Sequence, residues 1–128
     1  MRYYDEKRKE RYREELLEAW EETYKKGQLT FWIFLALKEN EKYVDEIKNF
    51  VTVKTNGILT CEEQSLYRTL RKYKELEMVD YRSGPGEGGP ERKYYFLTQL
   101  GAELLQQFSE RNIRLFFDPH IQDLIFKK

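Results

Sequence analysis

The residues most able to do chemistry lie on one face of an expected helix. Between Gln64 and Lys74 the sequence has four basic residues and no acidic one. At about 100° per residue, the side chains opposite the apolar side of this helix are Gln64, Arg68, Arg71 and Lys72. Arginine and glutamine can form hydrogen bonds with base edges, and arginine and lysine neutralise phosphate. The alternative is that these side chains only solvate a helix face.

A second group of cations follows a run of glycine and proline. Residues 82–98 contain four glycines and two prolines, all between Gly84 and Pro90, and the basic pair Arg92 and Lys93 follows after Glu91. Residues 78–83 and 93–97 alternate in the manner of short strands, so we interpret the segment as a β-hairpin. Its connection is too long and too rich in glycine for a tight turn, which predicts a mobile tip. Such a tip could bring Arg92 and Lys93 to a phosphate backbone.

The composition limits the classes of protein that could use these cations. The chain has 128 residues, of which 40% are hydrophobic and 36% charged, and its mean hydropathy is -0.85. These values predict one mostly helical domain with a thin core and much solvated surface. The 23 basic and 23 acidic residues cancel, so any charged function must be local.

Cofactor, catalytic and membrane chemistry find no support in the sequence. The single Cys61 excludes a disulfide framework, and no Cys/His cluster has zinc-site spacing, so we expect neither metal nor cofactor. Cys61 could sense oxidants at a helix start, but a small packed residue is the better interpretation. No nucleophile has a paired base, so we expect no enzyme. The absence of a signal peptide or long apolar run predicts a cytoplasmic protein without a membrane partner.

Hydrophobic periodicity predicts the helices that must position these groups. They are expected at 4–26, 28–39, 43–53, 61–76 and 99–117, followed by a short helix after Asp118 and Pro119. Gly27 would end the first helix. The helix at 28–39 is apolar over most of its circumference and should be the centre of the core. Thr60 and Glu63 fit a capping box, and Thr98 fits an N-cap.

The order of these elements predicts a winged helix-turn-helix, which is mainly α with a small β-hairpin. We divide the chain into an N-terminal helical arm at 1–27, a winged helix-turn-helix domain at 28–98, and a C-terminal dimerisation helix and tail at 99–128. In the second strand, Tyr95 and Leu97 are expected to face the core. The apolar stripe of the first helix needs a cover, and the stripe of the last long helix is larger than one small domain requires.

Several motifs together resemble the PadR family of bacterial and archaeal transcriptional regulators. The matching stretches are Tyr43-Val-Asp-Glu-Ile47, Gln64-Ser-Leu-Tyr-Arg-Thr-Leu-Arg71, Met78-Val79, and Gly89-Pro-Glu-Arg-Lys-Tyr-Tyr-Phe-Leu-Thr98 followed by Gly101. The similarity covers about residues 29–105, and the elements SLYxxL and RKYYxLTxxG are specific when both occur at this spacing. Val44 and Asp45 replace a glycine and a second tyrosine of the family, and an acidic residue near phosphate weakens docking.

The resemblance implies a homodimer that binds a pseudo-palindromic operator in double-stranded DNA, usually as a repressor. It also implies that an aromatic or hydrophobic small-molecule effector could release the DNA. By resemblance and helix angle, the DNA contacts are Gln64, Ser65, Tyr67, Arg68, Arg71 and Lys72, with Arg92 and Lys93 from the wing. The resemblance implies dimerisation through the long C-terminal helix, and we interpret the N-terminal helix as an additional dimer arm. The expected dimerisation residues are Leu16, Leu17, Trp20, Leu104, Phe108, Leu115 and Phe116.

One alternative function stays open at this point. A winged helix can lose DNA binding and act as a protein-interaction module through its apolar surfaces. The zero net charge favours this interpretation, whereas the acid-free stretch from Gln64 to Lys74 favours DNA.

Overall fold

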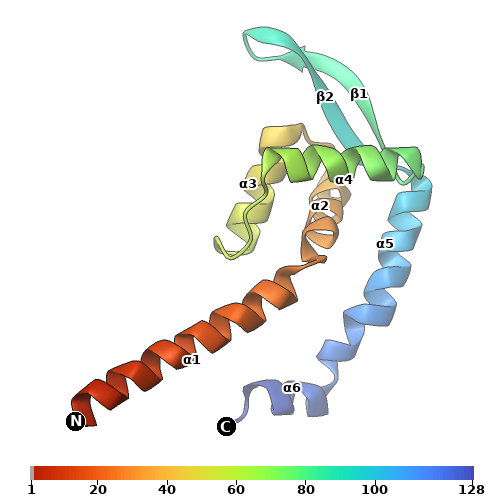
Figure 1. Ribbon diagram of the computed structural model, residues 1–128. Coiled ribbons are helices and arrows are strands. Elements are labelled where there is room, and N and C mark those ends of the chain that lie inside the picture. The colour runs from red at the N-terminus through yellow and green to blue at the C-terminus, as the bar shows by residue number, and fades with distance from the viewer. Residues whose placement is uncertain (1) are drawn as a thin grey trace.

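The computed structural model describes residues 2–128, with side chains from Asp5 onward (Figure 1). Met1, which the expected arm at 1–27 includes, lies outside the described residues. The elements in chain order are α1 (Arg2–Lys25), α2 (Gln28–Glu39), α3 (Val44–Lys54), α4 (Glu63–Glu75), β1 (Val79–Gly86), β2 (Gly89–Leu97), α5 (Gln99–Asn112), the 3-10 helix η1 (Arg114–Phe117) and α6 (Pro119–Phe126). The fold is mainly helical with one antiparallel hairpin, which confirms the winged helix-turn-helix prediction.

The core is built around α2, as its apolar circumference predicts. Ile33 and Ala36 of α2 are completely buried, and the core is completed by buried side chains from α3, the α3–α4 linker, α4, both strands and α5. The remaining core residues are Phe34, Leu37, Ile47, Val51, Leu59, Cys61, Leu66, Leu70, Val79, Tyr95 and Leu105. Among the residues with described side chains, α1 adds none to this core and projects from it as an arm (Figure 1).

The α4 helix begins two residues later than the capping box predicts. Its first residue is Glu63 and its N-cap is Glu62, without a side-chain cap bond, so the expected start at Cys61 is wrong. Leu59 and Cys61 are buried while Thr60 between them is exposed, which is the alternation of extended backbone. The hydroxyl of Thr55 also accepts a hydrogen bond from Leu59 N at 3.1 Å. Core burial of two alternate residues therefore overrides the local helix-start signal.

The hairpin tip is tighter than the sequence suggests. The two strands pair from Val79 with Leu97 up to Gly86 with Gly89, which leaves a two-residue connection, so the prediction of a long loose tip is wrong. The register shifts between Gly84 and Gly86. A Cβ on Gly86 would lie 2.6 Å from Pro90 O, so glycine permits the close approach that lets pairing continue.

The C-terminal helix is divided where the sequence predicts a continuous one. The Thr98 hydroxyl caps α5 by accepting from Gly101 N at 3.1 Å, as expected. However, α5 ends at Asn112 rather than at residue 117, and η1 follows. Asp118 is extended, because a proline disfavours the helical conformation in the residue before it. The carboxylate of Asp118 caps α6.

We predict that Gly101→Ala lowers the free energy of unfolding by about 1–3 kcal/mol. Glycine to alanine within a helix is normally stabilising by up to about 1 kcal/mol. At this position, however, the new Cβ would lie 2.0 Å from Met78 O. Urea unfolding of the two proteins measures the change. Gly89→Ala is the matched control, because its Cβ would have no neighbour closer than 3.9 Å. A Gly101→Ala protein as stable as the wild type would contradict this packing.

Candidate nucleic-acid interface

The polar face of α4 is open to solvent along its length. Leu66 and Leu70 point into the core, which turns the other side of the helix outward. The expected contact residues on that side are exposed, apart from a half-buried Ser65: Gln64, Tyr67, Arg68, Arg71 and Lys72. The α4 surface therefore combines two unobstructed arginines with a glutamine, which are the side chains that read bases in a major groove.

The wing brings two further cations beside the first turns of α4. Tyr67, Arg92 and Lys93 line one groove of about 410 Å³ between β2, α4 and the start of α3. The Arg92 guanidinium lies 4.1 Å from the ring centre of Tyr43, and Lys93 Nζ lies 4.6 Å from that of Tyr81. Aromatic faces hold both cations by cation–π attraction while their outer sides stay available.

Carboxylates line the same groove as these cations. Asp45, Glu63 and Glu91 all contribute to its walls. The sequence singled out Asp45 alone as an acid near the expected phosphate contacts, and the fold adds the other two. The groove itself is therefore of mixed charge, and the cationic surface lies further along α4.

Lys72 is set apart from the wing cations. It lines a different cavity of about 480 Å³ between α2, α4 and α5, and its Nζ lies 5.4 Å from the ring centre of Tyr73. The other side chains of this cavity are mostly apolar and include Phe31, Phe34 and Phe108. Lys72 thus borders a different hollow from Arg92 and Lys93, while its side chain is exposed on α4.

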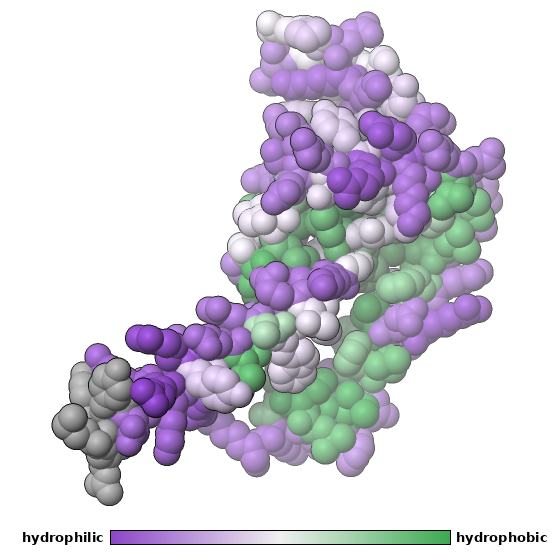
Figure 2. Space-filling model, viewed as in Figure 1, coloured by the Kyte–Doolittle hydropathy of each residue, from purple (hydrophilic) through white to green (hydrophobic). Residues whose placement is uncertain are grey.

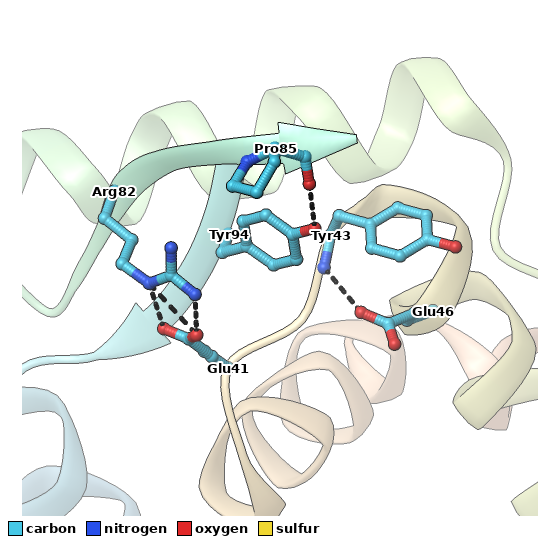
Figure 3. Close-up of polar contacts among 6 residues, drawn as sticks. All are labelled: Glu41, Tyr43, Glu46, Arg82, Pro85 and Tyr94. Carbon is cyan, nitrogen blue, oxygen red and sulfur yellow. Dashed lines mark hydrogen bonds and ion pairs between the residues drawn. The ribbon is translucent and has the colours of Figure 1, made fainter. Parts of the chain in front are cut away.

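Three residues near the wing carry contacts that sequence reasoning missed. Arg82 of β1 pairs with Glu41 in the linker between α2 and α3, and its guanidinium lies 4.7 Å from the ring centre of Tyr94 (Figure 3). The Tyr94 hydroxyl donates a hydrogen bond to Pro85 O at 2.8 Å. The observed hairpin register places Arg82 directly opposite Tyr94, whereas the loose tip expected from the sequence set no register. Glu41 lies too far away in sequence for any local pattern to find it.

Tyr95 faces the core, as the strand alternation predicts. Its exposed fraction is 6%, and burial raises the pKa of its phenol. The main chain of Tyr95 also pairs with Lys42 in an isolated β-bridge. The linker between α2 and α3 therefore runs along the outer edge of β2.

The opposite end of the molecule exposes many apolar side chains. Trp20 of α1 is 72% exposed, and Phe126 of α6 is 80% exposed. Most of the expected dimerisation residues are exposed, with Leu104 half-buried: Leu16, Leu17, Trp20, Phe108, Leu115 and Phe116. Figure 2 shows hydrophobic residues gathered at the bottom of the molecule, over η1 and α6. A surface of this kind marks an interaction site.

Neither a metal cluster nor a membrane span is found in the described part of the chain. Among residues 2–128, no three histidine, cysteine, aspartate or glutamate side chains gather as metal ligands. No helix within this range is long and apolar enough to cross a membrane.

The architecture is that of a winged helix-turn-helix regulator. The model of the transcriptional regulator PadR-like family matches residues 33–107, which is more than half of the chain. The protein belongs to this family. The family consists of transcriptional regulators and not of enzymes.

Solved structures show the same fold. A PadR-like transcription factor from Bacteroides fragilis is 28% identical with a TM-score of 0.61, over 73% of this chain and 88% of that one. A PadR-like transcriptional regulator from Bacillus cereus is 23% identical with a TM-score of 0.67, over 83% and 99%. Bacillus subtilis PadR, solved in complex with operator DNA, is 20% identical with a TM-score of 0.57, over 62% of this chain and 45% of that one.

We predict that Cys61 reacts about tenfold or more slowly with an aromatic disulfide reagent in the native protein than in denaturant. The thiol is 6% exposed, and burial raises its pKa, so the reactive thiolate is scarce at neutral pH. Stopped-flow absorbance follows the single cysteine in both states. Equal rates in the two states would instead support the redox-sensing interpretation.

Proposed function

We propose that the protein is a homodimeric DNA-binding repressor that acts on a pseudo-palindromic operator. The observation that carries this proposal is the open face of α4, on which Gln64, Arg68 and Arg71 are exposed beside a paired hairpin. The family membership supports a regulatory role. A repressor that works on DNA would act in the cytoplasm.

The dimensions of α4 suit a major groove. A helix of about 10–12 Å diameter fits a groove of about 12 Å width. Gln64, Arg68 and Arg71 then meet base edges, and Ser65, Tyr67 and Lys72 meet the sugar-phosphate backbone. The wing presents Arg92 and Lys93 to phosphates at the side of the groove. Because the groove beside the wing also contains carboxylates, α4 supplies most of the positive charge.

A second copy of the chain would bury the apolar side chains that one copy leaves exposed. We assign dimerisation to the arm at 1–27 and to the segment at 99–128. Burying aromatic and aliphatic side chains such as Trp20, Leu115 and Phe116 favours association by about 25 cal/mol per Å² of apolar surface. The entropy lost when two chains associate opposes this gain. A two-fold symmetric dimer presents two copies of α4, which is why the operator would be pseudo-palindromic.

An apolar effector is part of the proposal. The cavity of about 480 Å³ between α2, α4 and α5 has the size of a small-molecule site. Its walls include Phe31, Phe34 and Tyr73, and Lys72 of the recognition helix borders it. A hydrophobic or aromatic ligand in this cavity would contact α4 directly and could shift it against the DNA.

The second candidate function is a protein-interaction module without DNA binding. Asp45, Glu63 and Glu91 beside the wing favour it, because these carboxylates would face the phosphates of a docked duplex. A salt titration separates the two functions. Steep loss of binding to its own upstream DNA with rising salt supports the repressor, and no binding at about 50 mM salt supports the interaction module.

We predict that Arg68→Ala weakens operator binding by about 1–3 kcal/mol, because Arg68 reads a base. Fluorescence anisotropy with operator and random DNA at fixed salt measures the two affinities. Arg11→Ala is the control, since it removes the same charge from α1, which points away from α4 and the wing, and Arg11 lies on the face of that helix opposite Trp20 (Figure 1). Equal losses on operator and random DNA would show that Arg68 touches only phosphate.

We predict that Trp20→Glu weakens dimerisation about 30-fold or more, because a buried aromatic anchor is worth about 2 kcal/mol or more at an interface. Sedimentation equilibrium measures the change. Arg11→Glu introduces a carboxylate on the opposite face of α1 and should leave the dimer intact. If Trp20→Glu leaves the association constant unchanged, α1 is not part of the dimer interface.

A further inference from the structure

We propose that Glu41 and Tyr43, in the linker between α2 and α3, are positioning residues that hold the wing in its DNA-binding orientation. Neither residue reads DNA in this proposal, which rests on the proposed DNA-binding function. Both act through arginines of the hairpin, Glu41 through Arg82 and Tyr43 through Arg92. These contacts join the linker to both strands through Tyr94, whose ring lies between Arg82 and Tyr43; Figure 3 shows these three residues with Glu41.

The first link is a fork-shaped ion pair. Arg82 Nε lies 3.0 and 2.9 Å from the two carboxylate oxygens of Glu41, and Arg82 Nη2 donates to Oε1 of the same carboxylate. The hydrogen bond from Arg82 lowers the pKa of Glu41, so the carboxylate is ionised at neutral pH. The two residues are 41 positions apart in the chain, and a bidentate pair restrains direction as well as distance.

The second link is a stack of alternating cations and rings. The guanidinium of Arg82 lies 4.7 Å from the ring centre of Tyr94, and the rings of Tyr94 and Tyr43 meet edge to face at 5.9 Å. The guanidinium of Arg92 then lies 4.1 Å from the ring centre of Tyr43. Arg92 is thus held on a ring of the linker. It has no carboxylate partner within residues 2–128 and keeps its donors for a phosphate.

The linker itself is fixed to the core by the residue between Glu41 and Tyr43. Lys42 N donates to Tyr95 O at 3.0 Å, and Tyr95 N donates to Lys42 O at 2.8 Å. The Lys42 side chain is only 7% exposed, and its Nζ donates to Ala36 O at 2.7 Å. The residues on either side of Lys42 therefore present a rigid surface to the wing.

This arrangement predicts that neutralising Glu41 weakens operator binding, whereas charge alone predicts stronger binding. Glu41 is a negative charge near the proposed DNA surface, so its neutralisation should strengthen binding if only charge mattered. If Glu41 positions the wing, Glu41→Gln should weaken operator binding about threefold to tenfold for a dimer with two wings. Anisotropy titrations of wild type and variant measure the ratio. Stronger binding by Glu41→Gln would overturn the proposal.

Glu91→Gln is the matched control for the charge change. Glu91 is exposed on β2 and has no ion pair among the described residues. Because Glu91 lines the groove beside the wing, its neutralisation should strengthen operator binding slightly, which is the effect of the charge alone. The reciprocal exchange Glu41→Arg with Arg82→Glu should restore at least part of the affinity that each single change removes. If the double variant binds operator no more tightly than the single variant with the lower affinity, Arg82 itself contacts phosphate.

Tyr43 is tested through its ring. Tyr43→Phe keeps the surface on which Arg92 rests and should bind operator within about twofold of wild type, whereas Tyr43→Ala should lose about threefold to tenfold. Tyr43→Ala should change the slope of log K against log salt concentration by less than Arg92→Ala does. Equal losses for Tyr43→Phe and Tyr43→Ala would assign the effect to a hydroxyl–phosphate contact and overturn the positioning role.

A measurement without DNA separates this proposal from the proposed function. Hydrogen exchange of backbone amides in β1 and β2 should accelerate in Glu41→Gln and Arg82→Gln, relative to amides of α4, and return toward wild type in the exchanged pair. Unchanged wing exchange in both variants would overturn the positioning role even if the wild type binds operator. If the wild type binds no DNA but wing exchange responds as expected, the proposed function fails and the wing restraint stands.

Discussion

The enclosure of α2 is the constraint on which the other parts of this molecule depend. Ile33 and Ala36 are fully buried, and residues of α3, α4, the hairpin and α5 close around them. Because protein interiors are packed about as densely as organic crystals, each of these elements has one compatible position. The α4 helix therefore turns Leu66 and Leu70 inward, and its arginines have no alternative but to face solvent.

The small size of this core also divides the surface into two kinds. The end that carries α4 and the wing is polar, and the end that carries α1, η1 and α6 exposes large apolar side chains (Figure 2). A domain of this length cannot bury everything that its sequence makes hydrophobic. The chain is neutral as a whole, so its recognition chemistry depends on where the charges lie and not on how many there are.

Local patterns predicted those parts of the fold that depend on neighbouring residues. The α2 helix, the Thr98 cap, and Asp118 with Pro119 at the start of α6 all appear where helix periodicity and capping chemistry indicate. Within the candidate site, the same reasoning placed Arg68 and Arg71 correctly on the exposed side of α4. Which of the expected residues touch DNA stays a prediction.

Three features depended on contacts between distant segments and could not be read from local pattern. The start of α4 follows from the burial of Leu59 and Cys61, and the tight hairpin follows from glycines that let two strands approach. The pairing of Arg82 with Glu41 joins a strand to a linker far away along the chain. Sequence periodicity determines which face of an element is apolar, because that depends on residues three or four positions apart in a helix and two apart in a strand. Only packing in three dimensions decides which distant charge or backbone lies opposite that element, because the choice is made by shape and burial and not by spacing.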